Sequence, residues 1–481
     1  MSLTSTAMPF PEGLDPRIAE QLHDAGQAAI LAAWPRLPAD CRDTLAADLA
    51  AVDWTLLAEM RGLVARRAAG RGAATAGPDL ADAVTPPCIV LGDARNAIAP
   101  GRAADRGAAA LGAGRVGAVL VAGGQGSRLG YDGPKGCYPI GPVSGNSLFR
   151  LLLGKLAAVR RRHGRPVPLA IMTSAATDEA TREFLPRDGW CGLDPADVRI
   201  FRQASLPALD ATTGEMLRDQ PGRLALAPDG HGGMLTALAA DGLLDWFASR
   251  GVEHVVSFQV DNPLALPLHP EFLGYHLLTG AEFSTQVVLK QEPGERVGAV
   301  IESGGVHRVI EYSDLSPELA AARLPDGRLR FHAGSIAVHA FARPFLERAA
   351  ATAGSLPLHV AFKALPCVDG DGVRHVPARP NAIKFERFIF DLMPLARRVC
   401  VVQIEAADGF APLKNAAGAA ADTADHVRAA LVAQARRLLA ARGVDVAAGV
   451  PVELDAAHVI DEHDIDLPRG ARIDVPTVVG T

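Results

Sequence analysis

The spacing of apolar residues changes along the chain and predicts where helices and strands lie. Near the N-terminus, apolar positions recur at helical spacing over residues 18–34, 38–48 and 53–65. Further on, short apolar runs alternate with longer amphipathic stretches. The runs cover residues 116–122, 167–173, 198–203 and 254–260, and the stretches cover 146–162, 177–185 and 233–249. This alternation predicts an α/β fold, with a mainly parallel, Rossmann-like sheet flanked by helices.

The segments around this core have different patterns. Residues 70–110 are rich in Gly, Ala and Pro, which predicts a linker or an extended wrap. Residues 282–340 are typical of antiparallel strands, with a hairpin turn at 303–305. A last helical pattern ends near residue 442, before a short β-rich tail. We therefore expect an N-terminal helical segment and linker at 1–105, a main domain at 106–416 and a small C-terminal α+β domain at 417–481.

Composition narrows the function classes. The 481 residues include 48 Lys and Arg against 54 Asp and Glu, a formal net charge of −6, so no polybasic field for nucleic acid is present. The six cysteines include no Cys-x-x-Cys pair, which argues against a zinc site and a disulfide scaffold. No stretch approaches the roughly 20 apolar residues of a membrane span, and the start lacks a signal-peptide pattern. We expect a soluble, cytoplasmic protein.

Residues 116–135 carry the most specific signal, a buried-type strand followed by a glycine loop with two cations. The loop, residues 123–135, contains Gly123 and Gly124, which allow backbone amides to approach phosphate oxygens closely. Arg128 and Lys135 add positive charge. The string fits neither the Walker pattern nor the dinucleotide fingerprint. It predicts a cradle for a nucleoside triphosphate at the carboxyl end of a strand.

The full string, Gly-Gly-x-Gly-x-Arg-Leu-Gly followed by Pro-Lys, resembles the signature of sugar-nucleotide pyrophosphorylases. Other matching segments are Phe-Arg-Gln-Ala-Ser-Leu-Pro-Ala (201–208), Ala-Pro-Asp-Gly-His-Gly-Gly (227–233), Val-Asp-Asn (260–262), Val-Ile-Glu-Tyr-Ser-Asp (309–314), Phe-His-Ala-Gly-Ser (331–335), residues 380–391 and Ala-Pro-Leu-Lys-Asn (411–415). Together they resemble the UDP-N-acetylhexosamine pyrophosphorylase branch of the eukaryotic-type UTP:sugar-1-phosphate uridylyltransferases. The resemblance extends to about residue 416.

The resemblance implies a nucleotidyltransferase that forms a UDP-sugar and pyrophosphate from UTP and a sugar 1-phosphate, with residues 106–416 as its catalytic domain. Gln203 would read the uracil edge with its carboxamide, beside the backbone of Gly123 and Gly230. Arg128 and Lys135 would hold the triphosphate, and Lys414 would neutralise charge at the reacting phosphates. Lys384 is a second candidate cation in the same role.

Asp261 is the candidate metal residue. It directly follows the apolar run at 254–260, which places its carboxylate at the carboxyl end of a parallel strand, where α/β sheets bind ligands. A single carboxylate with phosphate oxygens and waters suits Mg²⁺, or Mn²⁺ in its place. An Asp at a strand end also serves commonly as a turn residue or helix cap.

The sugar side of the site is also implied by the resemblance, and it leaves the sugar open. Gly298, Glu311 and the 331–335 loop, with His332, match sugar-facing positions. Phe388 and Phe390 match aromatics beside an N-acetyl group. However, His231, His332 and Ser335 depart from the acetylhexosamine pattern, and Gly-His-Gly at 230–232 is closer to the UDP-glucose and broad-specificity branches.

We expect N-acetylglucosamine 1-phosphate as the substrate, with glucose 1-phosphate or a broad range of sugar 1-phosphates as the alternative. A non-catalytic sugar-nucleotide sensor on this fold would tend to lose the cations, all of which are present. A glycosyltransferase would more naturally carry Asp-x-Asp than the Val-Asp-Asn found here. We expect no nucleic-acid or membrane partner, and the oligomeric state stays open.

Overall fold

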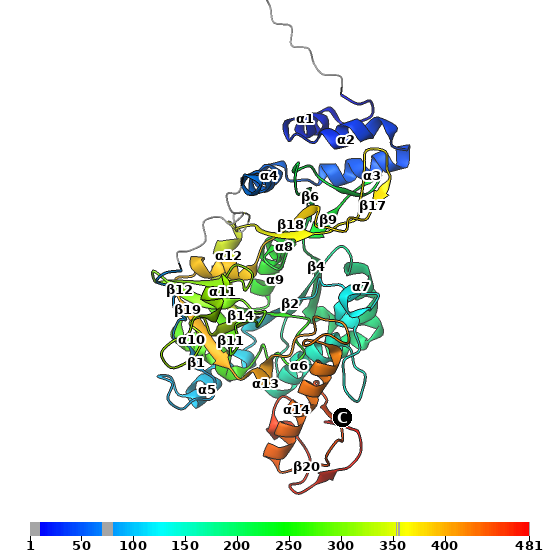
Figure 1. Cartoon of the computed structure of the whole chain (residues 1–481). Helices are drawn as coiled ribbons and strands as arrows, with labels where there is room; N and C mark the ends of the chain where they lie inside the picture. The colour runs from blue at the N-terminus through cyan, green and yellow to red at the C-terminus, as the bar shows by residue number, and fades with distance from the viewer. Residues whose placement is uncertain (1–9, 70–79, 353, 355, 481) are drawn as a thin grey trace, which may run out of the picture. The chain divides into compact units, whose positions relative to one another are not determined.

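The computed structural model describes residues 10–69, 80–352, 354 and 356–480, shown in Figure 1. The first nine residues and residues 70–79 of the expected linker therefore lie outside the described part. The chain forms two compact units. The first unit comprises Met1–Gly77, Ala204–Gly232 and Leu356–Phe388, and the second comprises Pro78–Gln203, Gly233–Ser355 and Ile389–Thr481. This division differs from the three consecutive domains expected from the sequence, because two later segments join the N-terminal helices.

The first unit combines the N-terminal helices with short antiparallel strands. Its helices are α1 (Pro16–Asp24), α2 (Ala28–Ala33), η1 (Trp34–Arg36, a 3₁₀ turn), α3 (Ala39–Ala50) and α4 (Trp54–Ala68). Its strands are β5 (Ser205–Pro207), β6 (Leu209–Asp210), β7 (Arg218–Gln220), β8 (Arg223–Leu224), β9 (Leu226–Pro228), β15 (His359–Lys363), β16 (Cys367–Val368), β17 (Arg374–His375) and β18 (Ala382–Glu386). The order β15-β18-β6 forms its largest sheet. Leu22, Trp34, Leu45 and Phe385 are among the residues of one apolar core that joins helices and strands.

The sequence predicted one helix over residues 18–34, but the structure breaks it into two. Gly26 adopts a φ of +59°, in the left-handed region that favours glycine. Gln27, which follows, is fully buried, and its Oε1 accepts a hydrogen bond from the backbone N–H of Met216 at 2.7 Å. The break therefore places a carboxamide where it binds the strand segment of the same unit.

The second unit contains the large sheet and its helices. In chain order, its elements up to residue 249 are β1 (Ile89–Val90), α5 (Pro100–Gly112), β2 (Val116–Val121), η2 (Ser127–Leu129), η3 (Lys135–Cys137), α6 (Leu148–His163), β3 (Leu169–Thr173), α7 (Asp178–Arg187), η4 (Gly189–Gly192), η5 (Pro195–Asp197), β4 (Val198–Arg202), α8 (Gly233–Ala240) and α9 (Leu243–Ser249). Then follow β10 (His254–Gln259), α10 (Pro270–Thr279), β11 (Phe283–Leu289), β12 (Ala299–Ser303), β13 (Val306–Ile310), α11 (Pro317–Ala321), β14 (Ala333–Ala342), α12 (Arg343–Ala350), η7 (Ile389–Leu395), β19 (Val399–Ile404), α13 (Ala406–Gly409), α14 (Ala424–Arg442), β20 (Asp445–Val446), β21 (Val452–Leu454), η8 (Glu462–Asp464), β22 (Arg472–Ile473) and β23 (Thr477–Val479).

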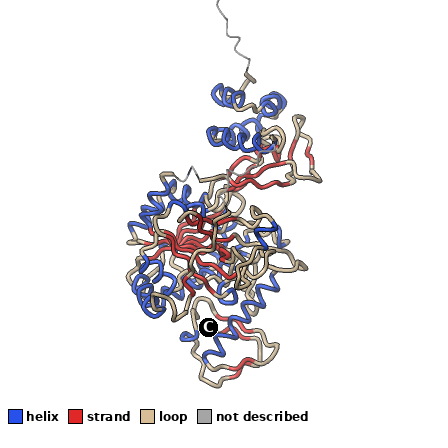
Figure 2. Tube along the Cα trace, turned by 60° about the vertical axis from the view of Figure 1, so that its left-hand side comes forward, coloured by secondary structure: helices blue, strands red, loops and turns tan. Residues whose placement is uncertain are grey.

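The strand order of the large sheet is β1-β19-β11-β14-β10-β2-β3-β4 (Figures 1 and 2). Neighbouring strands are parallel except at β14, which is antiparallel to both β10 and β11. The four strands predicted from apolar runs are present as β2, β3, β4 and β10. The mainly parallel α/β fold is thereby confirmed, and the carboxyl ends of β2, β3, β4 and β10 meet at one edge.

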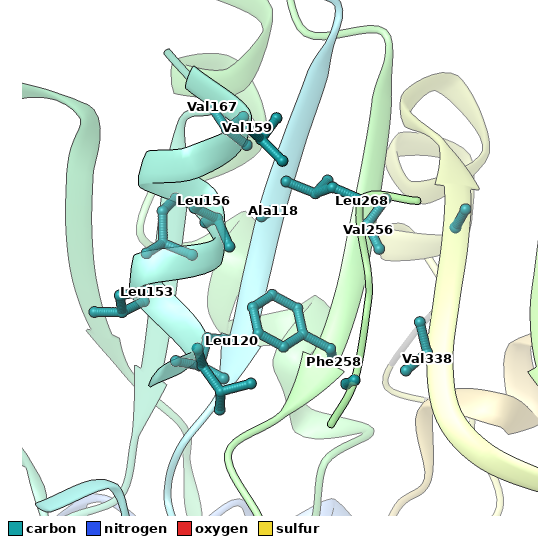
Figure 3. Close-up of a cluster of buried hydrophobic side chains, with 14 of the residues drawn as sticks. Ala118, Leu120, Leu153, Leu156, Val159, Val167, Val256, Phe258, Leu268 and Val338 are labelled. Carbon is teal, nitrogen blue, oxygen red and sulfur yellow. The ribbon is translucent and has the colours of Figure 1, made fainter. Parts of the chain in front are cut away.

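Helix α6 covers one face of this sheet. Its Ser147 cap accepts a hydrogen bond from the N–H of Arg150 at 3.1 Å, and Gly164 ends it in the left-handed region. Figure 3 shows Leu153 and Leu156 of α6 close to Leu120 of β2 and Phe258 of β10. This core holds the sheet edge in place for the site described below.

The expected linker at 70–110 was wrong over its last part, because residues 100–112 form helix α5. Its glycine and alanine content is a packing feature rather than a sign of irregular chain. A Cβ on Gly107 would lie 1.8 Å from the carbonyl oxygen of Pro270, and a Cβ on Gly274 would lie 1.7 Å from that of Ala103. Small residues thus let α5 and α10 approach backbone to backbone.

Two other expectations concern turns. The hairpin at 303–305 is confirmed, since β12 and β13 pair antiparallel and Gly304 and Gly305 both have positive φ. The helix predicted at 233–249 is divided into α8 and α9 by Gly242, which adopts a φ of 66°.

Within the described residues, no helix has the length and apolarity that crossing a membrane requires.

The C-terminal segment is joined to the rest of the second unit by polar contacts. Glu453 of β21 accepts hydrogen bonds from the backbone N–H of Val143 and Ser144 and from the Ser144 hydroxyl, at 2.6–2.9 Å. Arg162 of α6 pairs with both Asp461 and Asp464. The tail is therefore anchored on the loop before α6 and on the end of α6 itself.

Candidate functional site

The glycine loop leaves the carboxyl end of β2 and folds back on itself. The Gly126 N–H donates to the Gly133 carbonyl at 2.8 Å, and the Lys135 N–H donates to the Gly124 carbonyl at 2.9 Å. Gly130 adopts a φ of +69°, which a side chain would strain. Hydrogen bonds within the loop therefore fix the backbone positions from which the Arg128 and Lys135 side chains extend.

The predicted cations converge on the predicted carboxylate. Lys135 Nζ lies 4.0 Å from Asp261 Oδ2 and donates to the Leu413 carbonyl at 3.2 Å. The two charged side chains are 17% and 16% exposed, so neither is fully solvated. Burial lowers the pKa of Lys135, Asp261 opposes this effect, and the nearby charges of Arg128 and Lys414 lower the pKa further. Lys135 therefore lies beside the strand-end carboxylate of Asp261, with Arg128 of the same loop and Lys414 of a separate segment near Lys135.

Asn262, which the sequence reasoning did not single out, holds the loop that carries Lys414. Its Nδ2 donates to the Gly409 carbonyl at 2.8 Å, and its Oδ1 accepts from the Ala411 N–H at 3.0 Å. The Leu413 N–H in turn donates to the Asp261 carbonyl at 2.7 Å. The Val-Asp-Asn motif therefore has two functions, since its Asp faces the cations and its Asn fastens the neighbouring loop. The signal available in the sequence for Asn262 was its place directly after Asp261, at the end of the apolar run at 254–260.

Gln203 lies directly against the glycine loop. It is 6% exposed, and a Cβ placed on Gly123 would lie 2.8 Å from its Oε1. Ser174 contacts the same glycine, because its hydroxyl donates a hydrogen bond to the Gly123 carbonyl at 2.8 Å. Gly123 and Gln203 are thus brought together as expected, and only a glycine leaves the carboxamide room. Ser174 was not anticipated.

The predicted sugar-facing residues of the second unit form a second group. A Cβ on Gly298 would lie 3.0 Å from Glu311 Oε1, and the Gly298 carbonyl accepts from the Ser335 N–H at 2.8 Å. Phe390 is 6% exposed, in η7. Gly298, Glu311 and Ser335 are therefore neighbours, and they lie at one end of β12, β13 and β14.

His332 is held within its own loop. Its Nδ1 lies 2.9 Å from the Leu329 carbonyl and its Nε2 lies 3.3 Å from Arg328 Nη1. It is 7% exposed, and burial lowers its pKa. The ring therefore supports the loop that leads to Ser335, and its substrate contact stays a prediction.

Gly230, His231, Lys384 and Phe388 belong to the first unit. A Cβ on Gly230 would lie 2.4 Å from the Arg387 carbonyl, so the turn approaches the 387–388 segment closely. The His231 ring stacks on Phe388, with centroids 5.1 Å apart and planes at 20°. Lys384 lies on β18 and is half-buried. The structure therefore brings Gly230, His231 and Phe388 together.

His359 is a further member of this ring cluster that the sequence did not reveal. Its ring centroid lies 4.3 Å from that of Phe388. Burial, with His359 nearby, lowers the pKa of His231 to about 4, so His231 is neutral at physiological pH. A neutral imidazole can donate from one nitrogen and accept at the other, as recognition of sugar hydroxyl or amide groups requires.

A mainly parallel sheet with a glycine loop after β2, and a group of three cations at its carboxyl edge of which Lys135 lies beside Asp261, is typical of an α/β protein that binds nucleotide phosphates. Comparison with known proteins makes this specific. The family model for UTP–glucose-1-phosphate uridylyltransferase matches residues 102–424, and the chain belongs to that family of nucleotidyltransferases.

Relatives of similar length lie in the acetylhexosamine branch. The chain is 37% identical to human UDP-N-acetylhexosamine pyrophosphorylase-like protein 1 over 431 residues, which cover 87% of this chain and 84% of that protein. It is 36% identical to UDP-N-acetylglucosamine pyrophosphorylase of Saccharomyces cerevisiae, covering 73% and 75% of the two chains. The solved UDP-N-acetylglucosamine pyrophosphorylase of Trypanosoma brucei superposes with a TM-score of 0.78 at 26% identity, covering 94% and 95%.

Proposed function

We propose that this protein is a Mg²⁺-dependent uridylyltransferase that joins UTP to N-acetylglucosamine 1-phosphate, forming the UDP-sugar and pyrophosphate. The observation that carries the proposal is the position of Lys135 beside Asp261, with the charges of Arg128 and Lys414 near Lys135. The names of the relatives support uridylyl transfer and favour the N-acetylglucosamine substrate. The reaction is reversible, since a P–O–P bond is formed and another is broken.

The reaction requires little proton transfer by the side chains of the protein. A phosphate monoester has a second pKa of about 6, so the sugar-phosphate oxygen is already ionised at neutral pH. It attacks the α-phosphorus of UTP, the bond from that phosphorus to the bridging oxygen breaks, and pyrophosphate leaves with the electron pair. No general base is required. What must be supplied is charge neutralisation and alignment of two polyanions.

The cations match this demand. Lys135 and Arg128 extend from the glycine loop and would hold the triphosphate, together with loop amides that are not already bonded within the loop. Lys414 extends from the loop that Asn262 fastens beside Asp261, and would neutralise charge at the reacting phosphates. Because the Lys135 side chain is mostly buried, its charge is screened less than a surface charge would be. A non-catalytic sensor would not need this arrangement.

The residues present fit a magnesium ion. Asp261 offers a carboxylate oxygen, the hard ligand that Mg²⁺ prefers, and 16% of its side-chain surface is exposed. Asp261 would hold the ion, with UTP oxygens and water completing the coordination. When bound, the ion would supply further positive charge for the leaving pyrophosphate. Mn²⁺ shares the preference for oxygen ligands and would serve in its place.

Base selection would come from Gln203, whose carboxamide lies against Gly123 in a buried position. Uracil presents an N3–H donor between two carbonyl acceptors, which a carboxamide and backbone amides can match.

The neutral His231 favours a second substrate, glucose 1-phosphate, because an imidazole replaces the carboxamide expected for the acetylhexosamine branch at that position. The enzyme would act in the cytoplasm.

A pyrophosphate-release assay tests the proposal directly. UTP is offered with the 1-phosphates of N-acetylglucosamine, N-acetylgalactosamine, glucose and galactose, with Lys414→Ala as the inactive control. We expect Mg²⁺-dependent release that is fastest with N-acetylglucosamine 1-phosphate. Faster release with glucose 1-phosphate would transfer the assignment to the alternative substrate. No release with any of the four would refute the uridylyltransferase assignment.

A further inference from the structure

Helix α6 carries its one lysine on a buried face. Lys155 lies four residues after Leu151 and four before Val159, a spacing that puts the three side chains on one face of the helix. Leu151 and Val159 are 4% and 6% exposed, and Figure 3 shows Val159 close to Leu268. A polar group on such a face costs free energy unless it forms hydrogen bonds. The contacts of Lys155 must therefore explain its position.

These contacts are two backbone carbonyls just after Asp261. Lys155 Nζ donates to the Pro263 carbonyl at 2.5 Å and to the Ala265 carbonyl at 2.8 Å. Burial lowers the pKa of Lys155 to about 7, and no described carboxylate opposes this effect. A neutral amine still has two N–H groups, which is the number that the two carbonyls require. Lys155 therefore acts here as a double hydrogen-bond donor, with or without its charge.

The turn at 262–265 is held by these two hydrogen bonds. Among the described residues, neither carbonyl accepts another hydrogen bond. Pro263 has no N–H to donate, and the Asn262 side chain bonds the loop at 409–411 instead. Within the turn, the Ala265 N–H donates to the Asn262 carbonyl at 3.2 Å. Lys155 therefore joins this turn to helix α6.

The two segments that Lys155 joins belong to different parts of the catalytic site. Helix α6 is the first α-helix after the glycine loop at 123–135, and the turn at 262–265 directly follows Asp261. Strands β2 and β10, which precede the glycine loop and Asp261, are paired side by side. A shift of the turn away from α6 would move the Asp261 carboxylate relative to Lys135 Nζ, which lies 4.0 Å from it.

We propose that Lys155 is a positioning residue, which holds the turn at 262–265 on α6 and so fixes the Asp261 carboxylate for the metal ion. Outer hydrogen-bond partners of a metal site orient its ligands, and their loss weakens metal binding. The anchoring of the turn stands by itself, whereas its effect on the metal rests on the proposed function. The two are therefore measured separately.

A matched pair of variants isolates the amine. Lys155→Met removes it at similar volume and places an apolar side chain on an apolar face. Loss of two hydrogen bonds and removal of a buried ionisable group have opposite effects on stability, so the melting temperature should change little. Arg160→Met is the control, because it removes a positive charge from an exposed position of the same helix. Lys155→Leu, which also lacks the amine but differs in shape, replaces Lys155→Met if methionine prevents folding.

Hydrogen exchange of the metal-free protein tests the anchor. The peptide that covers residues 260–268 should exchange at least about threefold faster in Lys155→Met and at the parent rate in Arg160→Met. Unchanged exchange in Lys155→Met would overturn the proposal, because the turn would not depend on the lysine.

Calorimetric binding of UTP tests the consequence for the metal. The Kd measured with EDTA, divided by the Kd measured with Mn²⁺, gives the factor by which the metal strengthens binding. We expect Lys155→Met to lower this factor at least about threefold, with an unchanged Kd in EDTA. Arg160→Met should leave both values at those of the parent. An unchanged factor in Lys155→Met, or an equal loss of binding with and without metal, would overturn the positioning role.

The pyrophosphate-release assay connects the anchor with catalysis. We expect Lys155→Met to lower kcat at least about fivefold, while the preference for UTP over CTP, which we assign to Gln203, stays within about twofold of the parent. In Asp261→Asn, the same substitution should change the residual kcat by less than about twofold, because the residue through which it acts is already altered.

Two kinetic results would contradict this account in different ways. A full fivefold fall of kcat in the Asp261→Asn background would show that Lys155 acts elsewhere, and it would overturn the proposal. A parent protein that releases no pyrophosphate, but whose Mn²⁺-dependent binding of UTP requires Lys155, would count against the proposed function alone.

Discussion

The contact between Gly123 and Gln203 allows one added methyl group to test how the base is read. In Gly123→Ala the new Cβ would lie 2.8 Å from Gln203 Oε1, while Ser174 Cβ, at 3.4 Å, is a tolerable neighbour. Gly123 does not have a left-handed φ, so alanine introduces no backbone strain. The substitution therefore acts through the position of the Gln203 carboxamide.

The size of the effect follows from this distance. To restore a contact of 3.4 Å from 2.8 Å, the carboxamide oxygen must retreat by about 0.6 Å, which weakens or breaks one hydrogen bond to the base. One such bond contributes about 0.5–1.5 kcal/mol. The preference for UTP over CTP, as the ratio of kcat/KM values, should then fall about two- to tenfold.

Gly124→Ala is the matched control. Its Cβ would meet only Lys135 Cε, at 3.9 Å, an ordinary contact. Any crowding of phosphate by this methyl group should slow both nucleotides equally, so their ratio should stay unchanged, because the new Cβ does not touch Gln203. An unchanged ratio in Gly123→Ala, or an equal fall in both variants, would refute the assignment of Gln203 to the base. Thermal melts of the two variants exclude a general loss of stability.

The other predictions concern the charged cluster. Lys414→Ala should lower kcat by about 10²–10³-fold with an unchanged melting temperature, while Lys363→Ala, an exposed lysine on β15, should leave kcat unchanged; similar kcat values for the two variants would contradict the role of Lys414. Asp261→Asn should raise the Mg²⁺ concentration needed for half-maximal activity by tenfold or more, and chelation should silence the parent protein; identical Mg²⁺ titrations would remove Asp261 from the metal site. Because burial lowers the pKa of Lys135 from 10.5, the lysine loses its charge as pH rises through that lowered value, and kcat/KM for UTP should fall on the alkaline side. Lys135→Arg keeps its charge, so the fall should shift to higher pH, and superimposable profiles would show that another group titrates.

Much of the site was predictable because its chemistry follows strand ends. Apolar runs fixed β2, β3, β4 and β10, and parallel strands bring their carboxyl ends to one edge. Residues that follow the ends of these strands, among them Gly123, Gln203 and Asp261, were therefore expected at the same edge of the sheet. Strand-end position could not identify Lys414, whose role was assigned from the family resemblance alone.

The errors have a common physical origin, since small residues have two meanings in a sequence. The alanines and glycines of α5 were taken as a linker, although Gly107 is needed for the close approach to α10. Gly26 and Gly242 interrupt helical patterns that continue on both sides of them. Local pattern does not show whether a missing side chain serves flexibility or contact.

The sequence by itself determined the α/β order and the glycine loop, and it supplied the candidate residues for phosphate binding, because periodicity and strand-end position are local properties of the chain. Only the tertiary structure decided that β5, β6, β9 and β18 join the N-terminal helices and that Asn262 fastens the Lys414 loop. These features depend on which distant segments pack together. That choice is made by the sum of many weak contacts across the whole chain, which no single stretch of residues encodes.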